Sequence, residues 1–182
     1  MPTFDKRFLQ RIRVPLGFVF AILFVVFSRP DRTTLIVGGV IALIGLAIRA
    51  WASGHIRKAS ELAVSGPYAF TRNPLYLGSL ILGFGFTIAA GVWWLGLLFV
   101  LLFLGIYLPV MRVEVDDIRR IFGTDFDEYE REVPLFLPRL TPWRKNERKF
   151  DVSLYLRYRE YRAAIGATVA ITALALKAYF LS

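Results

Sequence analysis

The chain has 182 residues, of which 56% are hydrophobic and 20% charged, and its formal net charge is +9. Soluble globular chains contain about 45–50% apolar and about 25% charged residues, and a domain of this size cannot hide the apolar excess in one core. The composition therefore excludes an ordinary soluble protein. The absence of cysteine and the single histidine exclude disulfides, thiolate sites and multi-histidine metal centres.

Apolar stretches predict an all-α polytopic membrane protein, a single domain over residues 1–182 with about five membrane-spanning helices. A spanning helix needs roughly 20 residues, and basic residues at the ends of shorter stretches can reach the headgroups. The predicted spans are 14–28, 33–52, 75–90, 92–110 and 163–181.

The third and fourth spans come from one uncharged run, residues 73–111. As a single helix it would extend roughly 58 Å, about twice the thickness of the bilayer core. The run must therefore fold back on itself. Ala89, Ala90 and Gly91 are the predicted corner of a tight helical hairpin.

The distribution of charge predicts the orientation in the membrane. Basic residues concentrate in 6–13, 57–72 and 112–162, which five spans place on one side, opposite Arg29, Arg32 and Lys177. Because positive segments stay in the cytoplasm, we expect a cytoplasmic N-terminus and cytoplasmic segment 111–162, in the inner membrane if the cell is bacterial. The same rule explains the net charge without a nucleic-acid partner.

Segment 111–162 has its own helical pattern. Apolar residues at i, i+4, i+7 and i+11 from Met111 continue the fourth span as an amphipathic helix, which Gly123 should end. Thr124 is the predicted N-cap of a short second helix. Prolines in 134–142 exclude a regular helix there, and 151–162 is predicted as an interfacial helix that leads into the last span.

The sequence LAVSGPYAFTRNPLYLG, residues 62–78, is the most informative polar stretch. Turn-forming pairs at 66–67 and 73–74 expose backbone groups, and the second pair begins a helix whose free N–H groups point toward whatever docks there. Aromatic rings and charge are supplied by Tyr68, Arg72 and Tyr76. The alternative interpretation is a membrane-surface connector.

Three further side chains are candidates on residue type alone. Glu114 lies near the membrane boundary, where a carboxylate could hold a cationic or hydroxyl-bearing cofactor, although acidic residues there more often form a solvated face. Arg49 is either a membrane anchor or a ligand for an anionic headgroup. His55 suits general-base chemistry, but a lone surface histidine is more often inert.

The block SGPYAFTRNPLYLG, the apolar hairpin and RVEVDDIRRIFGTDFDEYEREVPLFLPR together resemble the integral-membrane methyltransferases. This family includes isoprenylcysteine carboxyl methyltransferase and the phospholipid N-methyltransferases, with a pattern of GPY, RHPxYxG, a hairpin, a glutamate pair, FGxxYxxY and VPxFxP. The resemblance covers residues 49–139. It implies S-adenosylmethionine as cofactor, a lipophilic or prenylated acceptor with an isoprenylcysteine-type carboxylate or a lipid headgroup, and a cytoplasmic segment that covers the cofactor site.

The resemblance also implies roles for individual residues. The implied cofactor contacts are Leu62, Val64, Gly66, Tyr68, Asn73, Pro74, Tyr76, Gly78 and Glu114. Arg72 and Glu114 are the implied catalytic residues, and Arg49 and Arg72 are the candidates for binding the acceptor. Asn73 replaces the usual histidine and Val115 replaces the second glutamate; asparagine can still form hydrogen bonds, but it cannot transfer the proton assigned to that histidine.

Methyl transfer from a sulfonium depends mainly on holding donor and acceptor in line in a dry cavity. The residues present favour an acceptor that is already anionic or already a free amine. Two alternatives remain open: an NADPH-dependent membrane reductase of a polyprenyl or sterol-like substrate, which is similar in the cofactor-binding half, and a non-catalytic membrane protein on the same scaffold.

Overall fold

The computed structural model describes residues 6–57, 60–144 and 148–181. Every regular element in these ranges is helical. In chain order they are α1 (Lys6–Phe27), α2 (Arg32–Ser53), the short 3-10 helix η1 (Gly66–Ala69), α3 (Pro74–Ala89), α4 (Trp93–Phe122), α5 (Thr124–Glu132), α6 (Val152–Arg157) and α7 (Tyr161–Leu181). The all-α prediction is confirmed.

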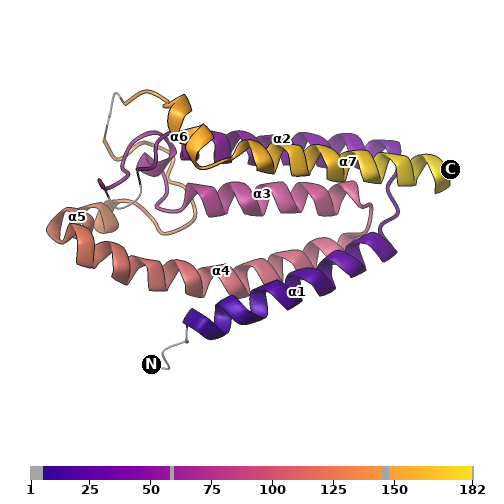
Figure 1. The fold of residues 1–182 in the computed structure, drawn as a ribbon, viewed down its shortest axis with the longest axis horizontal. Helices are drawn as coiled ribbons and strands as arrows, with labels where there is room; N and C mark the ends of the chain where they lie inside the picture. Colours follow the sequence, from indigo (N-terminus) through magenta and orange to yellow (C-terminus); the bar gives the residue numbers. More distant parts are fainter. Residues whose placement is uncertain (1–5, 58–59, 145–147, 182) are drawn as a thin grey trace.

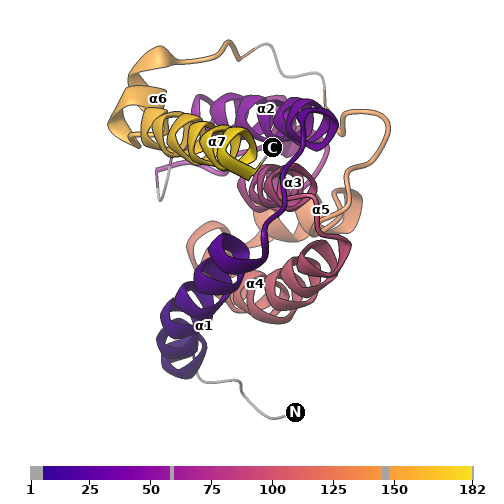
Figure 2. The same cartoon turned by 90° about the vertical axis from the view of Figure 1, so that its right-hand side faces the viewer.

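The long apolar helices indicate an integral membrane protein. By length and composition α2, α4 and α7 can each cross a bilayer, and Pro15–Phe27 and Pro74–Ala89 are shorter apolar helices. These five segments lie where the five spans are predicted. Figure 1 shows the long helices running along a common direction, and Figure 2 shows α2, α3 and α7 grouped together with α1 beside α4.

The helical hairpin turns at the predicted corner. α3 ends at Ala89, and Gly91 adopts φ +70°, a left-handed conformation that favours glycine. The hairpin is tight only at this corner, because α3 and α4 separate toward α5 (Figure 1). Large side chains extend into the space between them: the rings of Tyr76 and Tyr107 lie 5.2 Å apart.

α3 packs instead against α2 through glycines on facing sides of the two helices. A Cβ on Gly45 would lie 2.4 Å from the backbone nitrogen of Leu82, and a Cβ on Gly85 would lie 2.5 Å from that of Ala42. Small residues allow such close backbone approach between membrane helices. This contact fixes the start of α3 relative to the end of α2, where the polar residues begin.

The expectations for the segment after the fourth span are partly confirmed. α4 continues to Phe122, and Gly123 ends it with φ +53°. The prediction that Thr124 is an N-cap is wrong. Gly123 occupies the N-cap position, α5 begins at Thr124, and no side chain caps the helix. The predicted helix over 151–162 is broken, because Arg159 has a left-handed φ of +56° between α6 and α7.

The segment after α5 returns along the loop before α3, without regular helix, as the prolines predict. The backbone N–H of Arg72 donates to Pro134, that of Arg139 donates to Phe70, and that of Trp143 donates to Ala69. Below this segment lies a buried cluster made of Phe126, Tyr129 and Val133, with Leu62, Val64, Val115, Ile118, Phe122 and Trp143 packed around it. These contacts dock α5 over the end of the bundle.

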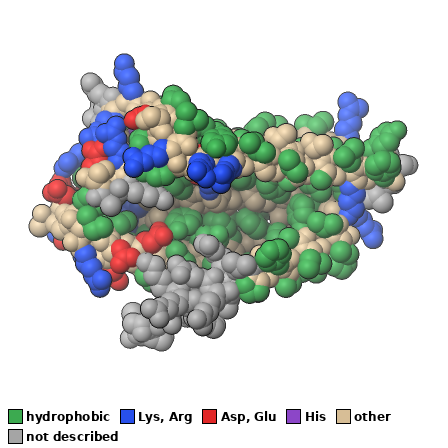
Figure 3. Space-filling model, viewed as in Figure 1, with side chains coloured by type: hydrophobic (Ala, Val, Ile, Leu, Met, Phe, Trp, Pro, Cys, Tyr) green, Lys and Arg blue, Asp and Glu red, His purple; other side chains and the backbone are tan. Residues whose placement is uncertain are grey.

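Charged side chains of both signs gather at the α5 end of the molecule, whereas the helices between the ends carry mostly hydrophobic side chains (Figure 3). Lys177 lies at the opposite end, where its Nζ donates to Ser28 Oγ at 2.9 Å. The described parts of basic segments 57–72 and 112–162 therefore share one end of the bundle, as predicted. Which end faces the cytoplasm stays a prediction.

Candidate functional site

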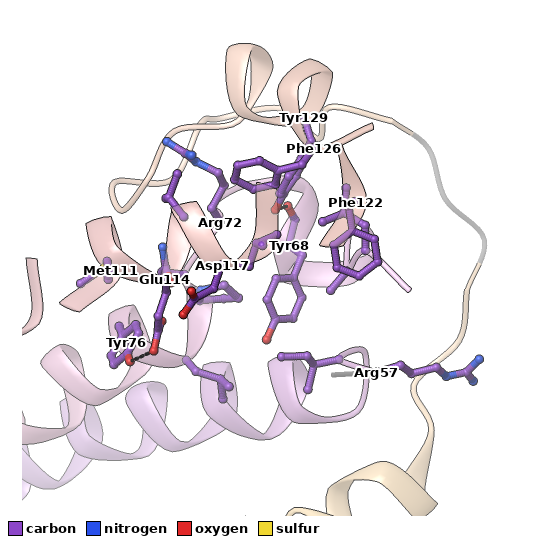
Figure 4. A pocket seen from close by; sticks show the side chains of 18 of the residues that line it. Arg57, Tyr68, Arg72, Tyr76, Met111, Glu114, Asp117, Phe122, Phe126 and Tyr129 are labelled. Atoms are coloured by element: carbon purple, nitrogen blue, oxygen red, sulfur yellow. Dashed lines mark hydrogen bonds between the residues drawn. The ribbon is translucent and has the colours of Figure 1, made fainter. Parts of the chain in front are cut away.

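A cavity of about 620 Å³ opens between α3 and α4 where the two helices separate, below α5. Figure 4 shows side chains converging on it from α3, α4, α5 and the loop before α3. Among the residues predicted for the site, the lining includes Arg49, Leu62, Tyr68, Arg72, Asn73, Pro74, Tyr76 and Glu114. Such a volume is in the range of roughly 300–1,000 Å³ of small-molecule sites.

Tyr76 and Glu114 meet across this cavity. Pro74 begins α3, so Tyr76 lies in its first turn, and Glu114 is on the part of α4 that extends beyond the apolar segment. The Tyr76 hydroxyl donates to Glu114 Oε1 at 3.1 Å (Figure 4). Among the described residues Glu114 forms no ion pair, so no described Lys or Arg side chain neutralises this carboxylate directly.

Tyr68 contributes a buried hydroxyl to the same cavity. Gly66, at φ +57°, begins η1 and directs Tyr68 inward, and Tyr129 holds the turn by donating from its hydroxyl to the Tyr68 carbonyl at 2.7 Å. Tyr68 is 5% exposed, and its hydroxyl has no hydrogen-bond partner among the described residues. Burial raises the pKa of this hydroxyl above its ordinary value, so it stays protonated and available as a donor.

Arg72 is held in the roof of the cavity by α5. Its Nη1 lies 2.6 Å from Glu130 Oε1, and its guanidinium lies over the Phe126 ring, 6.0 Å from the centroid. Glu130 also pairs with Arg119. Arg72 is therefore already paired with a carboxylate through Nη1, whereas its buried Nε has no hydrogen-bond partner among the described residues.

Asn73 joins the start of α3 to the returning segment. Its Nδ2 donates to the Leu135 carbonyl at 2.9 Å, and the neighbouring Thr71 hydroxyl donates to the Phe136 carbonyl at 2.8 Å. The asparagine thus positions the cavity wall through hydrogen bonds. Val115 lines the cavity and packs against the α5 cluster, so an apolar side chain suits this position, for which the resemblance implied a second glutamate.

Four candidates lie outside the cavity lining. Val64 packs against the α5 cluster, Gly66 faces the His55 ring, and Gly78 faces Arg49 and the Gly45 carbonyl of α2. His55 is buried rather than on the surface, with Nδ1 2.9 Å from the Trp51 carbonyl. Val64, Gly66 and Gly78 therefore support the wall of the cavity from behind. His55 does not reach the cavity.

Several lining residues were missed by sequence reasoning. They include Tyr107, Met111, Asp117, Phe122, Phe126, Tyr129 and Glu160. The recurrence of apolar residues on α4 and α5 predicted buried faces but not that those faces border a cavity. Glu160 had no sequence signal, because it reaches the site through a turn after α6.

A second cavity of about 270 Å³ adjoins the first on its apolar side. It is lined by Leu16, Gly17, Phe20, Ser79, Phe99, Leu102, Phe103, Ile106 and Tyr107. Ser79 and Tyr107 line both cavities. An apolar cavity between α1, α3 and α4 therefore lies next to the polar cavity, with Ser79 and Tyr107 at their common border.

The donor set of the polar cavity fits a cationic organic cofactor better than a metal ion. Within the described residues, no three His, Asp or Glu side chains group in a way that could hold a metal. By contrast, the Glu114 carboxylate, which forms no ion pair among the described residues, suits a positively charged group, and the Tyr68 hydroxyl has a hydrogen-bond donor to offer a ligand. Both observations fit S-adenosylmethionine, which carries a sulfonium, an amine and several oxygen and nitrogen acceptors.

Comparison with known proteins gives one family and two relatives. A sequence model of the phospholipid methyltransferases matches residues 34–125. The chain is 33% identical over 114 residues to the nickel-cobalt-cadmium resistance protein NccN of Alcaligenes xylosoxydans xylosoxydans, covering 62% of this chain and 52% of the relative. It is 35% identical over 145 residues to the cobalt-zinc-cadmium resistance protein CzcN of Cupriavidus metallidurans, covering 72% of this chain and 64% of the relative.

The chain thus spans less than two thirds of the length of either relative. No solved structure matches it significantly.

Proposed function

The chain belongs to the phospholipid methyltransferase family, and from this membership we propose that it transfers a methyl group from S-adenosylmethionine to a lipophilic acceptor at the cytoplasmic face of the membrane. The observation that carries the proposal is the meeting of Tyr76 and Glu114 across one cavity, at 3.1 Å. Tyr76 and Glu114 are 38 residues apart in the chain, and each lies in one of the two sequence blocks that carry the resemblance to the family.

In this proposal the cavity residues bind and orient the cofactor, which supplies an electrophilic methyl group on a sulfonium. Glu114 complements its positive charge, and Tyr76 fixes the orientation of that carboxylate. The Tyr68 hydroxyl, which has no hydrogen-bond partner among the described residues, donates a hydrogen bond to the cofactor. Leu62, Asn73 and Pro74 form the adjoining wall.

Catalysis then rests on positioning and on exclusion of water, because displacement at a sulfonium methyl needs no further activation of the donor. Phe126 and Tyr129 are both nearly fully buried and close the cavity on the α5 side. Arg72, in the roof, is the residue proposed to orient the acceptor.

The apolar second cavity supports a lipophilic acceptor. Its lining comes mainly from α1 and α4, and it meets the polar cavity at Ser79 and Tyr107. A chain in this space would place its polar end beside the site proposed for the cofactor. The acceptor group is either an isoprenylcysteine-type carboxylate or a lipid headgroup, and both reach the site from the bilayer.

The orientation belongs to the same proposal. Five spans, formed by α1, α2, α3, α4 and α7, put the N-terminus, α5 and the polar cavity in the cytoplasm. The soluble cofactor would then reach the cavity from the cytoplasm.

Binding of S-adenosylhomocysteine to the detergent-purified protein tests this proposal, with NADPH as the comparison ligand. A ligand that binds only the folded state raises the melting temperature. We expect stabilisation by S-adenosylhomocysteine, and a larger stabilisation by the positively charged S-adenosylmethionine that Glu114→Gln loses. Glu128→Gln is a matched control because Glu128 forms an exposed pair with Arg144 away from the cavity. Stabilisation by NADPH alone would favour the reductase, and stabilisation by neither would overturn the proposal.

A further inference from the structure

Arg49 and Glu160 form a largely buried ion pair in the wall of the polar cavity. Arg49 Nε lies 3.1 Å from Glu160 Oε2, and Nη2 lies 2.8 Å from both carboxylate oxygens. The side chains are 22% and 13% exposed. The pair joins the last turns of α2 to the residue just before α7, 111 positions later in the chain.

Glu160 reaches this position through a left-handed residue. Arg159 has φ +56°, and the backbone N–H of Glu160 donates to the Tyr155 carbonyl at 3.3 Å. A non-glycine residue in this region costs about 1–2 kcal/mol, and such conformations persist where surrounding contacts hold them. The ion pair with Arg49 is a contact of that kind. Arg49 lies within residues 34–125, which match the family model, whereas Glu160 lies outside them.

The pair also fixes where the free side of the guanidinium points. Arginine carries five N–H donors in a rigid plane. Glu160 takes those on Nε and Nη2, and Nη1 donates to Ser79 Oγ. The second N–H of Nη1 has no partner among the described residues, and Ser79 lines both cavities.

The geometry points to Glu160 as a positioning residue for the acceptor: it holds Arg49 so that Nη1, together with Ser79, presents a donor to a polar oxygen of a lipid whose chain occupies the apolar cavity. The recognised chemistry is an oxygen atom, of a phosphate, carboxylate or carbonyl, at the head of an apolar chain. This inference rests on the proposed function for its reaction but on Arg49, Ser79 and Glu160 alone for its binding step.

Glu160→Gln is the test variant, because it keeps the size of the side chain and removes its charge. Glu160→Asp restores the carboxylate, Arg49→Lys keeps the positive charge without the planar fork, and Glu128→Gln removes an exposed carboxylate elsewhere. Melting temperature and S-adenosylhomocysteine affinity are measured for each variant, so that folding and cofactor binding are known separately.

The first readout is transfer of labelled methyl from S-adenosylmethionine to vesicles of total lipid extract. We expect Glu160→Gln and Arg49→Lys each to raise the lipid concentration for half-maximal transfer by about 10- to 100-fold, the effect of losing a charged hydrogen bond on affinity, with the maximal rate and the cofactor-analogue affinity unchanged. Glu160→Asp should recover part of the loss, and the double variant should be no worse than either single variant. A merely structural pair would lower the melting temperature in these variants without moving the half-maximal lipid concentration, which would overturn the inference.

The second readout needs no reaction and separates this inference from the proposed function. Purified proteins are passed through size-exclusion chromatography, and the lipid retained per chain is quantified by mass spectrometry. Less retained lipid in Glu160→Gln and Arg49→Lys than in wild type and Glu128→Gln supports the positioning role even if no methyl transfer occurs, an outcome that would remove the methyltransferase proposal alone. Equal retention in all four proteins overturns the role of Glu160.

Discussion

Replacing Gly45 by alanine tests how the contact between α2 and α3 supports the site. The new Cβ would lie 2.4 Å from the Leu82 backbone nitrogen and 2.7 Å from the Gly78 carbonyl oxygen. Carbon contacts are normally about 3.5–4.0 Å, so the two helices must separate by about 1 Å. Backbone atoms cannot rotate away as a flexible side chain can, and the whole helix contact must adjust.

The expected cost follows from this displacement. Overpacking of a well-packed interface costs about 1–3 kcal/mol in free energy of unfolding, which for a chain of this length lowers Tm by roughly 2–12 °C. Arg49 lies one turn beyond Gly45, and Tyr76 lies two residues before Gly78. A shift of about 1 Å at reacting groups can lower a rate about 100-fold. We therefore expect the rate of methyl transfer to fall markedly even where most of the protein is still folded.

Intrinsic tryptophan fluorescence during thermal unfolding in detergent measures the stability, and S-adenosylhomocysteine calorimetry measures the state of the cavity. Gly39→Ala is the matched control on the same helix, because a Cβ there meets no atom within 4 Å. We expect Gly39→Ala to melt at or above the wild-type temperature and to bind the analogue normally. Equal melting temperatures for Gly39→Ala and Gly45→Ala would refute the packing argument.

Three further predictions concern the roof and wall of the cavity. Tyr68→Phe removes a buried hydroxyl with no partner among the described residues, so Tm should rise. The affinity for S-adenosylhomocysteine should fall about tenfold, which corresponds to roughly one hydrogen bond. A fall in both Tm and affinity would show that the hydroxyl stabilises the fold. Burial raises the pKa of Tyr68 and of Tyr129, so both hydroxyls stay protonated in the folded chain, whereas in the unfolded chain they ionise near pH 10. The free energy of unfolding should therefore decline as the pH rises above about 10. The double variant Tyr68→Phe/Tyr129→Phe should flatten that decline in thermal melts between pH 9 and 11. Glu130→Gln leaves Arg72, whose side chain is 12% exposed, without its carboxylate partner. We expect the free energy of unfolding to fall by about 1–3 kcal/mol, against less than about 0.5 kcal/mol for Glu128→Gln at an exposed position. Similar melting temperatures for the two variants would contradict this prediction.

Local signals in the sequence were enough to predict the five long apolar helices and the corner of the hairpin. An uncharged run too long for one span requires a turn, and Gly91 supplies the left-handed residue there. The spacing of apolar residues after Met111 predicted the continuation of α4, and Gly123 its end. Glu114 and Tyr76 were predicted to share a site from the family pattern, and the structure brings their side chains together.

The features that escaped prediction depend on pairings between distant segments. Nothing near Arg72 indicates that Glu130 would pair with it, and nothing near Arg49 indicates Glu160. The turn at Arg159 carries no glycine or proline, so the residue sequence predicted an unbroken helix over 151–162. A single sequence reports local conformational preference, whereas these ion pairs arise only after α5 and α7 dock on the rest of the fold.

Transfer of labelled methyl from S-adenosylmethionine into a total lipid extract, by wild type and by Glu114→Gln, tests the proposed activity most directly. We expect label in a chloroform-soluble product for the wild type and its loss in the variant, with Glu128→Gln fully active. A wild-type protein that binds S-adenosylhomocysteine but labels no lipid, or a Glu114→Gln protein as active as the wild type, would contradict it.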